Sequence, residues 1–159
     1  MGITLTEDEA WERLASAHTG ILTTLRRDGR PVPLPVWFAV LDRAIYVRTP
    51  SAAAKVKRIR NDPRAAFLVE SGTSWIELTA VLVQGDAHVV DDEGEARRAI
   101  KALQEKYAGH GVPSAAPKAT LDHYGKGMTV IRIDPAGTPL TWDNSKLRLR
   151  GRDTTSEEE

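Results

Sequence analysis

Apolar residues near the start of the chain recur at the spacing of one helical face: Ala10, Trp11, Leu14 and Ala15. Just before them, Thr6 and Glu9 stand three residues apart, which is the spacing of a capping box. In a capping box the hydroxyl and the carboxylate each accept a hydrogen bond from a backbone amide at the helix start. The pattern therefore predicts an amphipathic helix over residues 7–17.

After this helix the apolar pattern changes to a period of two, which predicts β-strands. Six strands are expected, over residues 20–25, 31–41, 44–48, 64–70, 75–90 and 128–133. Gly29 and the pair Asp42-Arg43 are typical of tight turns between strands. The strand over 75–90 is long enough to need a bend, which we place at Gly85.

The second predicted strand begins with prolines at alternate positions, Pro31, Pro33 and Pro35. Proline has no backbone N–H to donate to a neighbouring strand. One edge of this strand must therefore be unpaired or face a ligand. Unpaired edges and a long strand are features that a second copy of the chain would cover, so we expect a homodimer.

Three more helices are predicted, over residues 52–60, 92–106 and 118–124. Ser51 is expected to act as the N-cap of the first of them. Residues 138–150 have a weaker, strand-like pattern. We expect both Trp75 and Trp142 to pack in the core, and a ring-stacking or substrate-pocket role is the alternative.

Together the elements predict a mainly β fold with covering helices, a small six-stranded antiparallel barrel in one domain over residues 1–150. Turn-linked strands argue against a doubly wound sheet. Residues 151–159 form a polar tail that we expect to be disordered.

Composition places the chain among ordinary globular proteins. It has 159 residues, no cysteine, and 22 basic against 22 acidic residues. The absence of cysteine excludes disulfides and thiolate chemistry, and a neutral chain is not typical of nucleic-acid binding. The longest nearly apolar run, Pro31 to Leu41, is too short to span a membrane. The first residues do not have the pattern of a signal peptide, so a cytoplasmic protein is expected.

Charge is unevenly distributed along the chain. Residues 43–64 hold seven basic residues and one acidic residue, whereas residues 65–95 hold seven acidic residues and neither Lys nor Arg. One short basic element in a neutral protein favours a compact anionic ligand over a polymer. The alternative is that the two stretches neutralise each other in the fold.

The basic stretch has the order strand, tight turn, small residues and basic helix. A helix start offers free amides and partial positive charge, and Lys55 lies one turn into the predicted helix. The alanines at 52–54 leave room for a phosphate to approach the backbone. From spacing alone, an amphipathic helix with solvated basic residues is an equal alternative. His18, His88, His110 and His123 are scattered without the spacing of a metal site, so no bound metal is expected.

Several segments resemble, in their order, the flavin-binding split β-barrel proteins related to pyridoxamine 5′-phosphate oxidase, and more narrowly the actinobacterial branch that uses the deazaflavin F420. The segments run Gly20-Ile-Leu-Thr-Thr-Leu25, Asp28-Gly-Arg-Pro31, Val36-Trp-Phe38, Ala44-Ile-Tyr-Val-Arg-Thr49, Lys55-Val-Lys-Arg-Ile59, Asp62-Pro-Arg64 and Gly85-Asp-Ala87. The resemblance covers roughly residues 7 to 135. It implies a split β-barrel of the FMN-binding type, in a homodimer with the cofactor at the subunit interface.

The resemblance also implies roles for individual residues. Lys55 matches the lysine that binds the cofactor phosphate, and Ser51 precedes it at the start of the basic helix. Lys57 and Arg58 follow it and are placed to reach the phosphate or a polyglutamate tail. Arg48 and Thr49 match the strand end beside the phosphate and ribityl chain. The strand along the tricyclic ring is matched by Leu34, Pro35, Val36 and Trp37.

The function implied is an F420H2-dependent reductase that acts on a small unsaturated or quinone-like molecule. Such chemistry needs no nucleophile, because the cofactor carries the hydride. An FMN-binding oxidoreductase of the same fold and a non-catalytic cofactor-binding protein are the alternatives. Vitamin B6 oxidation is not expected, because the arginine-glutamine strand motif and the C-terminal substrate motif of the true oxidases are not found. The catalytic residues stay unassigned.

Overall fold

The computed structural model describes residues 3–147, so the tail predicted over 151–159 and the end of the extension predicted over 138–150 lie outside it. The first helix, α1 (Glu7–Ser16), begins with the predicted capping box. Glu9 N–H donates to the Thr6 hydroxyl, and Thr6 N–H donates to the Glu9 carboxylate. Ala10, Trp11 and Leu14 point into the core, as the helical spacing predicted.

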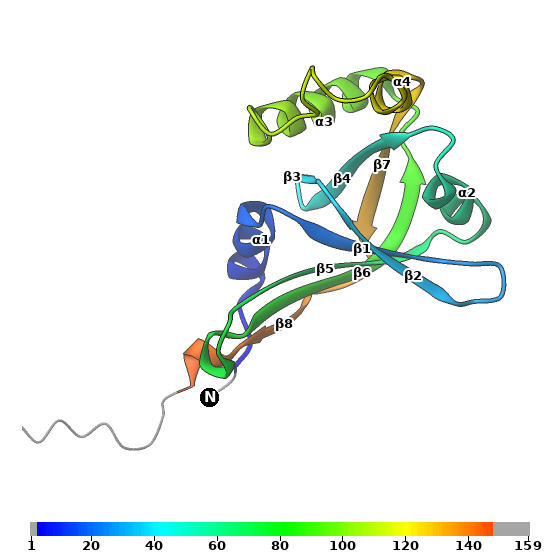
Figure 1. Ribbon diagram of the computed structural model, residues 1–159. Helices are drawn as coiled ribbons and strands as arrows, with labels where there is room; N and C mark the ends of the chain where they lie inside the picture. Colours follow the sequence, from blue (N-terminus) through cyan, green and yellow to red (C-terminus); the bar gives the residue numbers. More distant parts are fainter. Residues whose placement is uncertain (1–2, 148–159) are drawn as a thin grey trace, which may run out of the picture.

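The described residues form eight strands rather than the six predicted. Their bounds are β1 (Gly20–Leu25), β2 (Pro31–Val36), β3 (Ala39–Leu41), β4 (Ala44–Pro50), β5 (Arg64–Ser71), β6 (Thr79–Val89), β7 (Met128–Pro135) and β8 (Leu140–Asp143). All pairings are antiparallel, in the order β2-β1-β5-β6-β7-β4-β3, with β8 paired to β6. Figure 1 shows the strands curving into the predicted split β-barrel.

The strand predicted over 31–41 is two strands, separated at Trp37 and Phe38. Phe38 turns into the core against Phe67, and its backbone N–H donates to the Tyr107 hydroxyl instead of to a strand. Because β2 and β3 stand at the two ends of the sheet path, the chain crosses from one end to the other at Trp37. We call this crossing, residues 37–38, the seam. The alternate prolines lie on β2, which is a strand at the end of the sheet path. Such a strand has one edge where backbone N–H donors are not needed, as the sequence required.

The strand predicted over 75–90 begins later, at Thr79. Residues Trp75–Glu77 form a 3-10 helix instead, because the Glu77 carboxylate accepts hydrogen bonds from the backbone at Thr73 and Ser74. Near Gly85, β6 changes its partner from β8 to β7. A Cβ at Gly85 would stand 1.8 Å from the Asp134 carbonyl oxygen, so only glycine fits this close approach.

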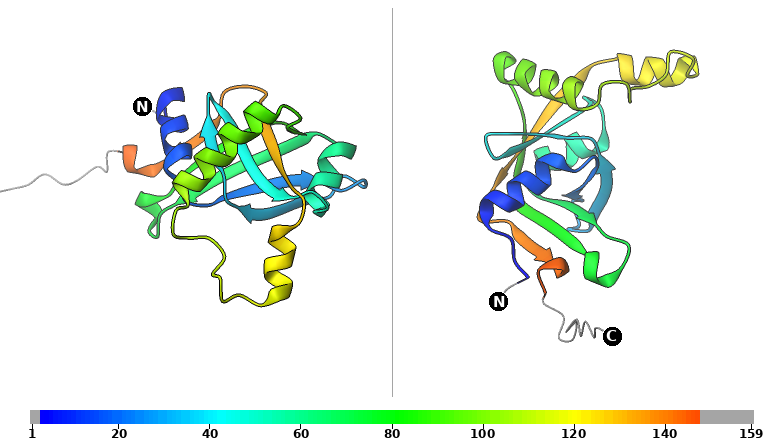
Figure 2. Two further views of the ribbon diagram at one scale, coloured as in Figure 1. Left: turned by 90° about the horizontal axis from the view of Figure 1, so that it is seen from above. Right: turned by 90° about the vertical axis from the view of Figure 1, so that its left-hand side faces the viewer.

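Residues 3–147 form four α-helices, three of which pack on the barrel. Besides α1 these are α2 (Ala54–Asn61), α3 (Glu93–Lys106) and α4 (Lys118–Gly125), and a second 3-10 helix spans Asn144–Lys146. α1 packs against β3 and β6, α2 against β1 and β6, and α3 against β3, β4 and β7. The largest core cluster joins the buried faces of α1 and α2 to the inner face of the sheet. In Figure 2, α4 and the loop before it stand away from the barrel.

Two predictions about side chains are wrong. Ser51 does not cap α2: the helix begins two residues later than predicted, at Ala54, and Ala53 is its N-cap without a side-chain hydrogen bond. Ser51 lies instead in the turn after β4, where its N–H donates to the Gly127 carbonyl. Trp75 and Trp142 are exposed rather than in the core. They lie near β8, on the outer side of the sheet, and the Trp142 indole donates to Asn144.

Candidate functional site

The candidate site is a cleft beside the seam, with a volume of about 790 Å³. One wall is the barrel, through the end of β2, Trp37, the end of β4 and the first turn of α2. The opposite wall is the loop over residues 110–116 and the inner side of α4. The cleft therefore lies between β2, at one end of the sheet path, and β4, next to its other end. Among the described strands, β2 pairs only with β1, so its other edge is unpaired.

The barrel wall of the cleft is basic. Arg48 is exposed and Lys55 is half-buried, with its Nζ 3.5 Å from the Thr49 hydroxyl, which accepts its hydrogen bond. Burial lowers the pKa of Lys55, and the nearby Arg58 cation lowers it further. The Lys55 ammonium has lost water and lies near another positive charge, and it has not gained a carboxylate partner. No Asp or Glu is among the described residues that line the cleft, so its electrostatics favour an anion.

Next to this basic wall lies a flat aromatic surface. Trp37 stacks on Tyr107 with ring centroids 4.3 Å apart and an interplanar angle of 4°. The Tyr107 hydroxyl accepts from Phe38 N–H and donates to the His18 carbonyl, at 3.0 and 2.7 Å. Trp37 remains 40% exposed and lines the cleft. One face of the indole is thus fixed against Tyr107, and the rest is available to a planar ligand.

A second hollow of about 640 Å³ adjoins the cleft on the other side of the α2 start. It shares Pro50, Ala53 and His123 with the cleft and is also lined by Ser51 and Lys126. The first turn of α2 is therefore open from both sides. Free amides at a helix start and the dipole of the helix both attract an anion to this place.

The structure brings together six of the ten residues predicted for the site: Pro35, Val36, Trp37, Arg48, Thr49 and Lys55 line the cleft. Ser51 lies in the adjoining hollow. Leu34 and Lys57 are exposed outside both spaces. Arg58 also lies outside them, because its Nε donates to the Thr24 hydroxyl of β1 at 2.7 Å.

The predicted alternative, neutralisation of the basic stretch by the acidic one, is not what the described residues show. Arg43 pairs with Glu7 and Asp8, and Arg64 pairs with Asp62. Glu95, from the acidic stretch, pairs with Arg132. Within residues 3–147 no ion pair joins the two stretches, so the charge of Arg48 and Lys55 faces the cleft uncompensated.

Sequence reasoning missed the far wall of the cleft. His110, His123 and Tyr124 line it, together with apolar residues of the loop. His110 lies edge-on to His18, with ring centroids 5.3 Å apart, and His18 lies edge-on to Trp37. The loop carries no motif that would have marked it. The only signal in the sequence was the presence of histidines close to a glycine-rich loop.

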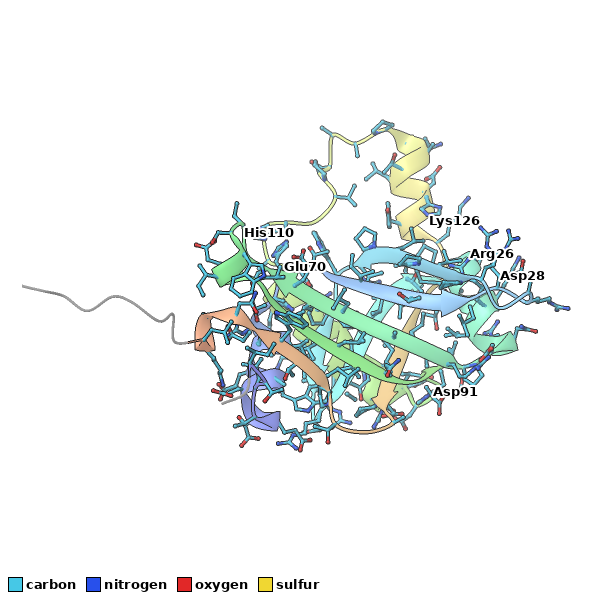
Figure 3. The ribbon with its side chains drawn as sticks, turned by 90° about the horizontal axis from the view of Figure 1, so that it is seen from below. Arg26, Asp28, Glu70, Asp91, His110 and Lys126 are labelled. Atoms are coloured by element: carbon cyan, nitrogen blue, oxygen red, sulfur yellow. The ribbon has the colours of Figure 1, made fainter. Side chains whose placement is uncertain are left out.

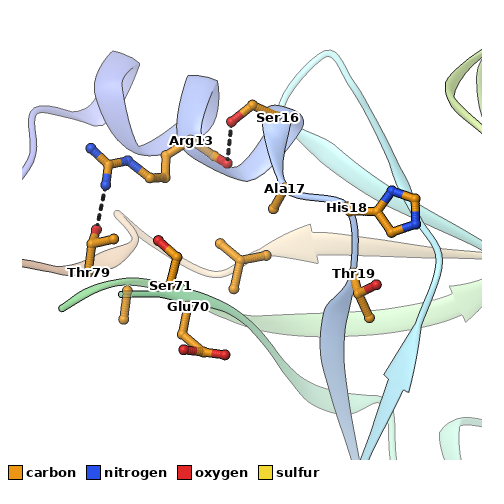
Figure 4. A pocket seen from close by; sticks show the side chains of 10 residues that line it. Arg13, Ser16, Ala17, His18, Thr19, Glu70, Ser71 and Thr79 are labelled. Atoms are coloured by element: carbon orange, nitrogen blue, oxygen red, sulfur yellow. Dashed lines mark hydrogen bonds between the residues drawn. The ribbon is translucent and has the colours of Figure 1, made fainter. Parts of the chain in front are cut away.

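A separate cavity of about 460 Å³ lies between the end of α1 and the strands β5 and β6. It shares no residue with the cleft. Figure 4 shows Arg13 on its wall, with a guanidinium that donates to Thr79 at 2.7 Å. The same guanidinium pairs with Asp143 at 3.2 Å. Arg13 therefore connects α1 to β6 and β8, which is a structural role. The cleft remains the candidate site.

Residues 3–147 hold no group of three or more His, Asp or Glu side chains arranged to bind a metal ion. None of the helices in this range combines the length and the apolar character needed to cross a membrane.

Solved structures with the same fold come from several bacteria. The conserved hypothetical protein Rv2991 of Mycobacterium tuberculosis is 27% identical with a TM-score of 0.75, and the match covers 93% of this chain and 94% of that one. A protein of Mesorhizobium loti described as FAD-binding is 20% identical with a TM-score of 0.66, over 86% and 92% of the two chains. An FAD-binding protein of Mycobacterium smegmatis is 20% identical with a TM-score of 0.61, over 88% and 98%.

The family comparison covers most of the chain. Residues 6–139 match the family described as pyridoxamine 5′-phosphate oxidase. This span runs from the cap of α1 to the residue before β8, and it includes the seam, both walls of the cleft and the first turn of α2. The chain therefore belongs to the pyridoxamine 5′-phosphate oxidase family.

Proposed function

We propose that this protein is an F420H2-dependent reductase that transfers a hydride to a small unsaturated or quinone-like molecule. The observation that carries the proposal is the combination, in one cleft, of the Trp37 surface with Lys55 and no lining carboxylate among the described residues. A flavin-type cofactor has the same division, with a planar ring at one end and a phosphate chain at the other. When bound, it would supply the hydride, so the protein needs neither a nucleophile nor a metal.

The residues present fit such a cofactor. Pro35, Val36 and Trp37 offer an apolar surface beside the ring, and about 790 Å³ is within the range of small-molecule sites. Lys55 and the amides at the start of α2 would hold the phosphate, and Thr49 would keep the Lys55 ammonium in place. Each contact uses a group that the fold leaves without an anionic partner.

The choice of F420 over FMN follows from the surplus of positive charge near the phosphate end. Lys57 is exposed beyond the cleft on the same helix as Lys55, and Arg58 lies on that helix with its Nε bonded to Thr24. Lys126 lines the adjoining hollow, and Asp122, which also lines it, offsets only one of these cations. A single phosphate needs few of these cations, whereas a polyglutamate tail would use several. FMN is the alternative cofactor, supported by the FAD-binding relatives of the same fold. A cofactor-binding protein without catalytic activity is the third candidate.

We also propose a homodimer with the cofactor at its interface. An apolar row crosses the outer face of the sheet through directly opposed residues: Pro35, Ile21, Leu68, Leu82 and Leu140. Leu140 is 60% exposed, and Trp142 stands beside it. Because the row begins at Pro35, which lines the cleft, a second copy covering the row would also reach the open side of the cleft.

Titration of the purified protein with oxidised F420 and, separately, with FMN tests the proposed cofactor. We expect saturable binding of F420, seen as quenching of its fluorescence, and weaker binding of FMN. Tighter binding of FMN would favour the alternative cofactor, and no binding of either would overturn the enzyme proposal. Light scattering tests the dimer, which is expected at about twice 17.5 kDa. The variant Leu140→Asp should shift this mass toward the monomer, and a wild-type monomer would contradict the proposed interface.

A further inference from the structure

The far wall of the cleft carries one exposed ring, that of His110, that is held by a hydrogen bond within its own loop. His110 Nδ1 lies 3.0 Å from the Ala108 carbonyl oxygen, and His110 N–H donates to the Tyr107 carbonyl at 3.0 Å. A carbonyl oxygen only accepts, so Nδ1 must carry a proton. In the neutral ring Nε2 is then the unprotonated nitrogen. When the ring is charged, the additional proton is on Nε2.

His110 is also placed beside the surface assigned to the cofactor ring. It lines the cleft together with Trp37, and its ring lies edge-on to His18, which lies edge-on to Trp37. Figure 3 shows His110 toward the end of the molecule that carries Glu70, away from the hairpin tip with Arg26 and Asp28. The groups around it are His18, Tyr107, and across the cleft Arg48, Lys55 and His123.

We propose that His110 donates the proton that completes reduction of the substrate, an inference that rests on the proposed function. His123 and Tyr124 line the same cleft, but both belong to α4 and neither has a described hydrogen bond that sets its orientation. His123 also opens onto the hollow at the α2 start, the phosphate end. His110 alone among these three combines a fixed tautomer with a ring contact to His18, which itself lies against Trp37.

The step balances for a conjugated ketone. A bound reduced cofactor would supply the hydride, and with it two electrons, to the β-carbon. The π electrons of the carbon–carbon double bond move toward the carbonyl, whose oxygen gains negative charge. That oxygen takes the proton from Nε2, which leaves neutral His110 with its remaining proton on Nδ1 and the hydrogen bond to Ala108 intact. Water then restores the proton to Nε2.

The first test needs no turnover. Long-range nitrogen–proton NMR of the wild-type protein identifies which ring nitrogen of each histidine carries the proton at a pH where the ring is neutral. The His110→Gln variant assigns the signal. We expect the Nδ1–H form for His110, so that Nε2 is free to gain and lose the transferred proton. The Nε2–H form would overturn the proposal.

The second test uses two matched variants, His110→Gln and His123→Gln, with F420H2 and the probe substrates 2-cyclohexenone and menadione. We expect His110→Gln to bind F420 as tightly as the wild type but to reduce the faster probe about 10²- to 10⁴-fold more slowly. The wild-type rate should fall as pH rises and Nε2 loses its proton, and this fall should be absent in His110→Gln. His123→Gln, at a residue that also lines the cleft, should keep the fall of the rate with pH even where it weakens cofactor binding.

The outcomes separate this proposal from the one it rests on. If wild-type protein binds neither F420 nor FMN, or reduces neither probe, the proposed function fails and the proton donor fails with it. If the wild-type protein binds the cofactor and reduces a probe, but His110→Gln keeps the wild-type rate and pH profile, only the assignment of His110 is overturned. An equal loss in His123→Gln would also overturn it, because the effect would then belong to the cleft wall as a whole.

Discussion

Two helices of eight residues each border the cleft, and they are held in different ways. α2 buries Val56 and Ile59 in the main core and packs against β1 and β6. α4 has no buried residue, and Leu121 and Tyr124 are exposed. Neither helix has a side-chain capping bond, so the difference lies in burial. Figure 2 shows the result: α2 lies on the barrel, whereas α4 projects from it.

The difference divides the cleft into a fixed wall and an adaptable one. Lys55 belongs to α2, so the cation and the helix start are already in place before an anion binds, which reduces the entropy lost on binding. His123 and Tyr124 belong to α4, which buries no residue, so little free energy is needed to move this helix. A constant cofactor suits the first wall, and substrates of different shape suit the second.

The largest expected effect comes from loosening the fixed wall. Ile59→Ala removes a side chain that is 3% exposed and leaves a cavity between α2 and the sheet. We expect it to lower the free energy of unfolding by about 2–5 kcal/mol, measured by urea denaturation. Lys57→Ala, on the exposed face of the same helix, serves as the control and should change stability by less than about 0.5 kcal/mol. Equal effects of the two would show that α2 is not anchored in the core.

A second prediction concerns the charge on that wall. Lys55→Ala removes one charge-assisted contact, which should weaken F420 binding by about 1.5–3 kcal/mol, or roughly 10- to 150-fold. Lys57→Ala should weaken it less, because Lys57 lies outside the cleft. Fluorescence titrations at two salt concentrations measure both, and circular dichroism checks the fold. Unchanged affinity in Lys55→Ala would leave the basic helix as a solvated face, the alternative that the sequence left open.

The fixed wall was largely predictable from sequence, because its signals are local. The helix predicted over 52–60 located α2 to within two residues, and Lys55 followed from its place one turn into that helix. The exception is Ser51, where the local preference of serine for an N-cap lost to a contact with Gly127, far along the chain. Such a long-range hydrogen bond leaves no trace in a window of neighbouring residues.

The helix of the adaptable wall was predicted close to its observed bounds, but its place in the cleft was not, because its residues meet the seam only through the fold. Tyr107 bonds Phe38 across 69 positions of the chain, and no periodic pattern links the two. Trp37 and Phe38 read as part of one long strand, since nothing nearby shows that a tyrosine hydroxyl replaces the strand partner. The prediction that Trp75 and Trp142 pack in the core was wrong for a related reason. Large apolar residues are expected in the core of a single chain, but they also occur on surfaces that a partner covers.

A third prediction concerns the C-terminal end of α3, which precedes the loop of the adaptable wall. Lys106 Nζ is buried without a hydrogen-bond partner, 3.7 Å from the centroid of the Phe38 ring. Burial lowers the pKa of Lys106 to about 8. Between that value and the ordinary one of 10.5, the unfolded chain holds the proton more firmly than the folded protein. The free energy of unfolding should therefore rise with pH across this window.

Urea denaturation of wild type and Lys106→Met at pH 7 and pH 10 measures this rise. Wild type should gain stability relative to the Met variant between the two pH values. Solvent around the half-buried side chain should hold the gain to about 1 kcal/mol or less. A difference between the two proteins that stays constant with pH would show that the ammonium keeps its proton through its contact with Phe38.

The smallest effect is expected on α4 itself, and it is the sharpest test of the comparison. Leu121 is 39% exposed and packs into no core cluster of the described residues, so Leu121→Ala should change the free energy of unfolding by less than about 0.5 kcal/mol. Hydrogen exchange should agree, with amides of α4 exchanging faster than those of α2 in the same protein. A second copy of the chain resting on α4 would reverse both results. A loss near that of Ile59→Ala, or slow exchange in α4, would therefore place this helix within the interface and make both walls of the cleft fixed.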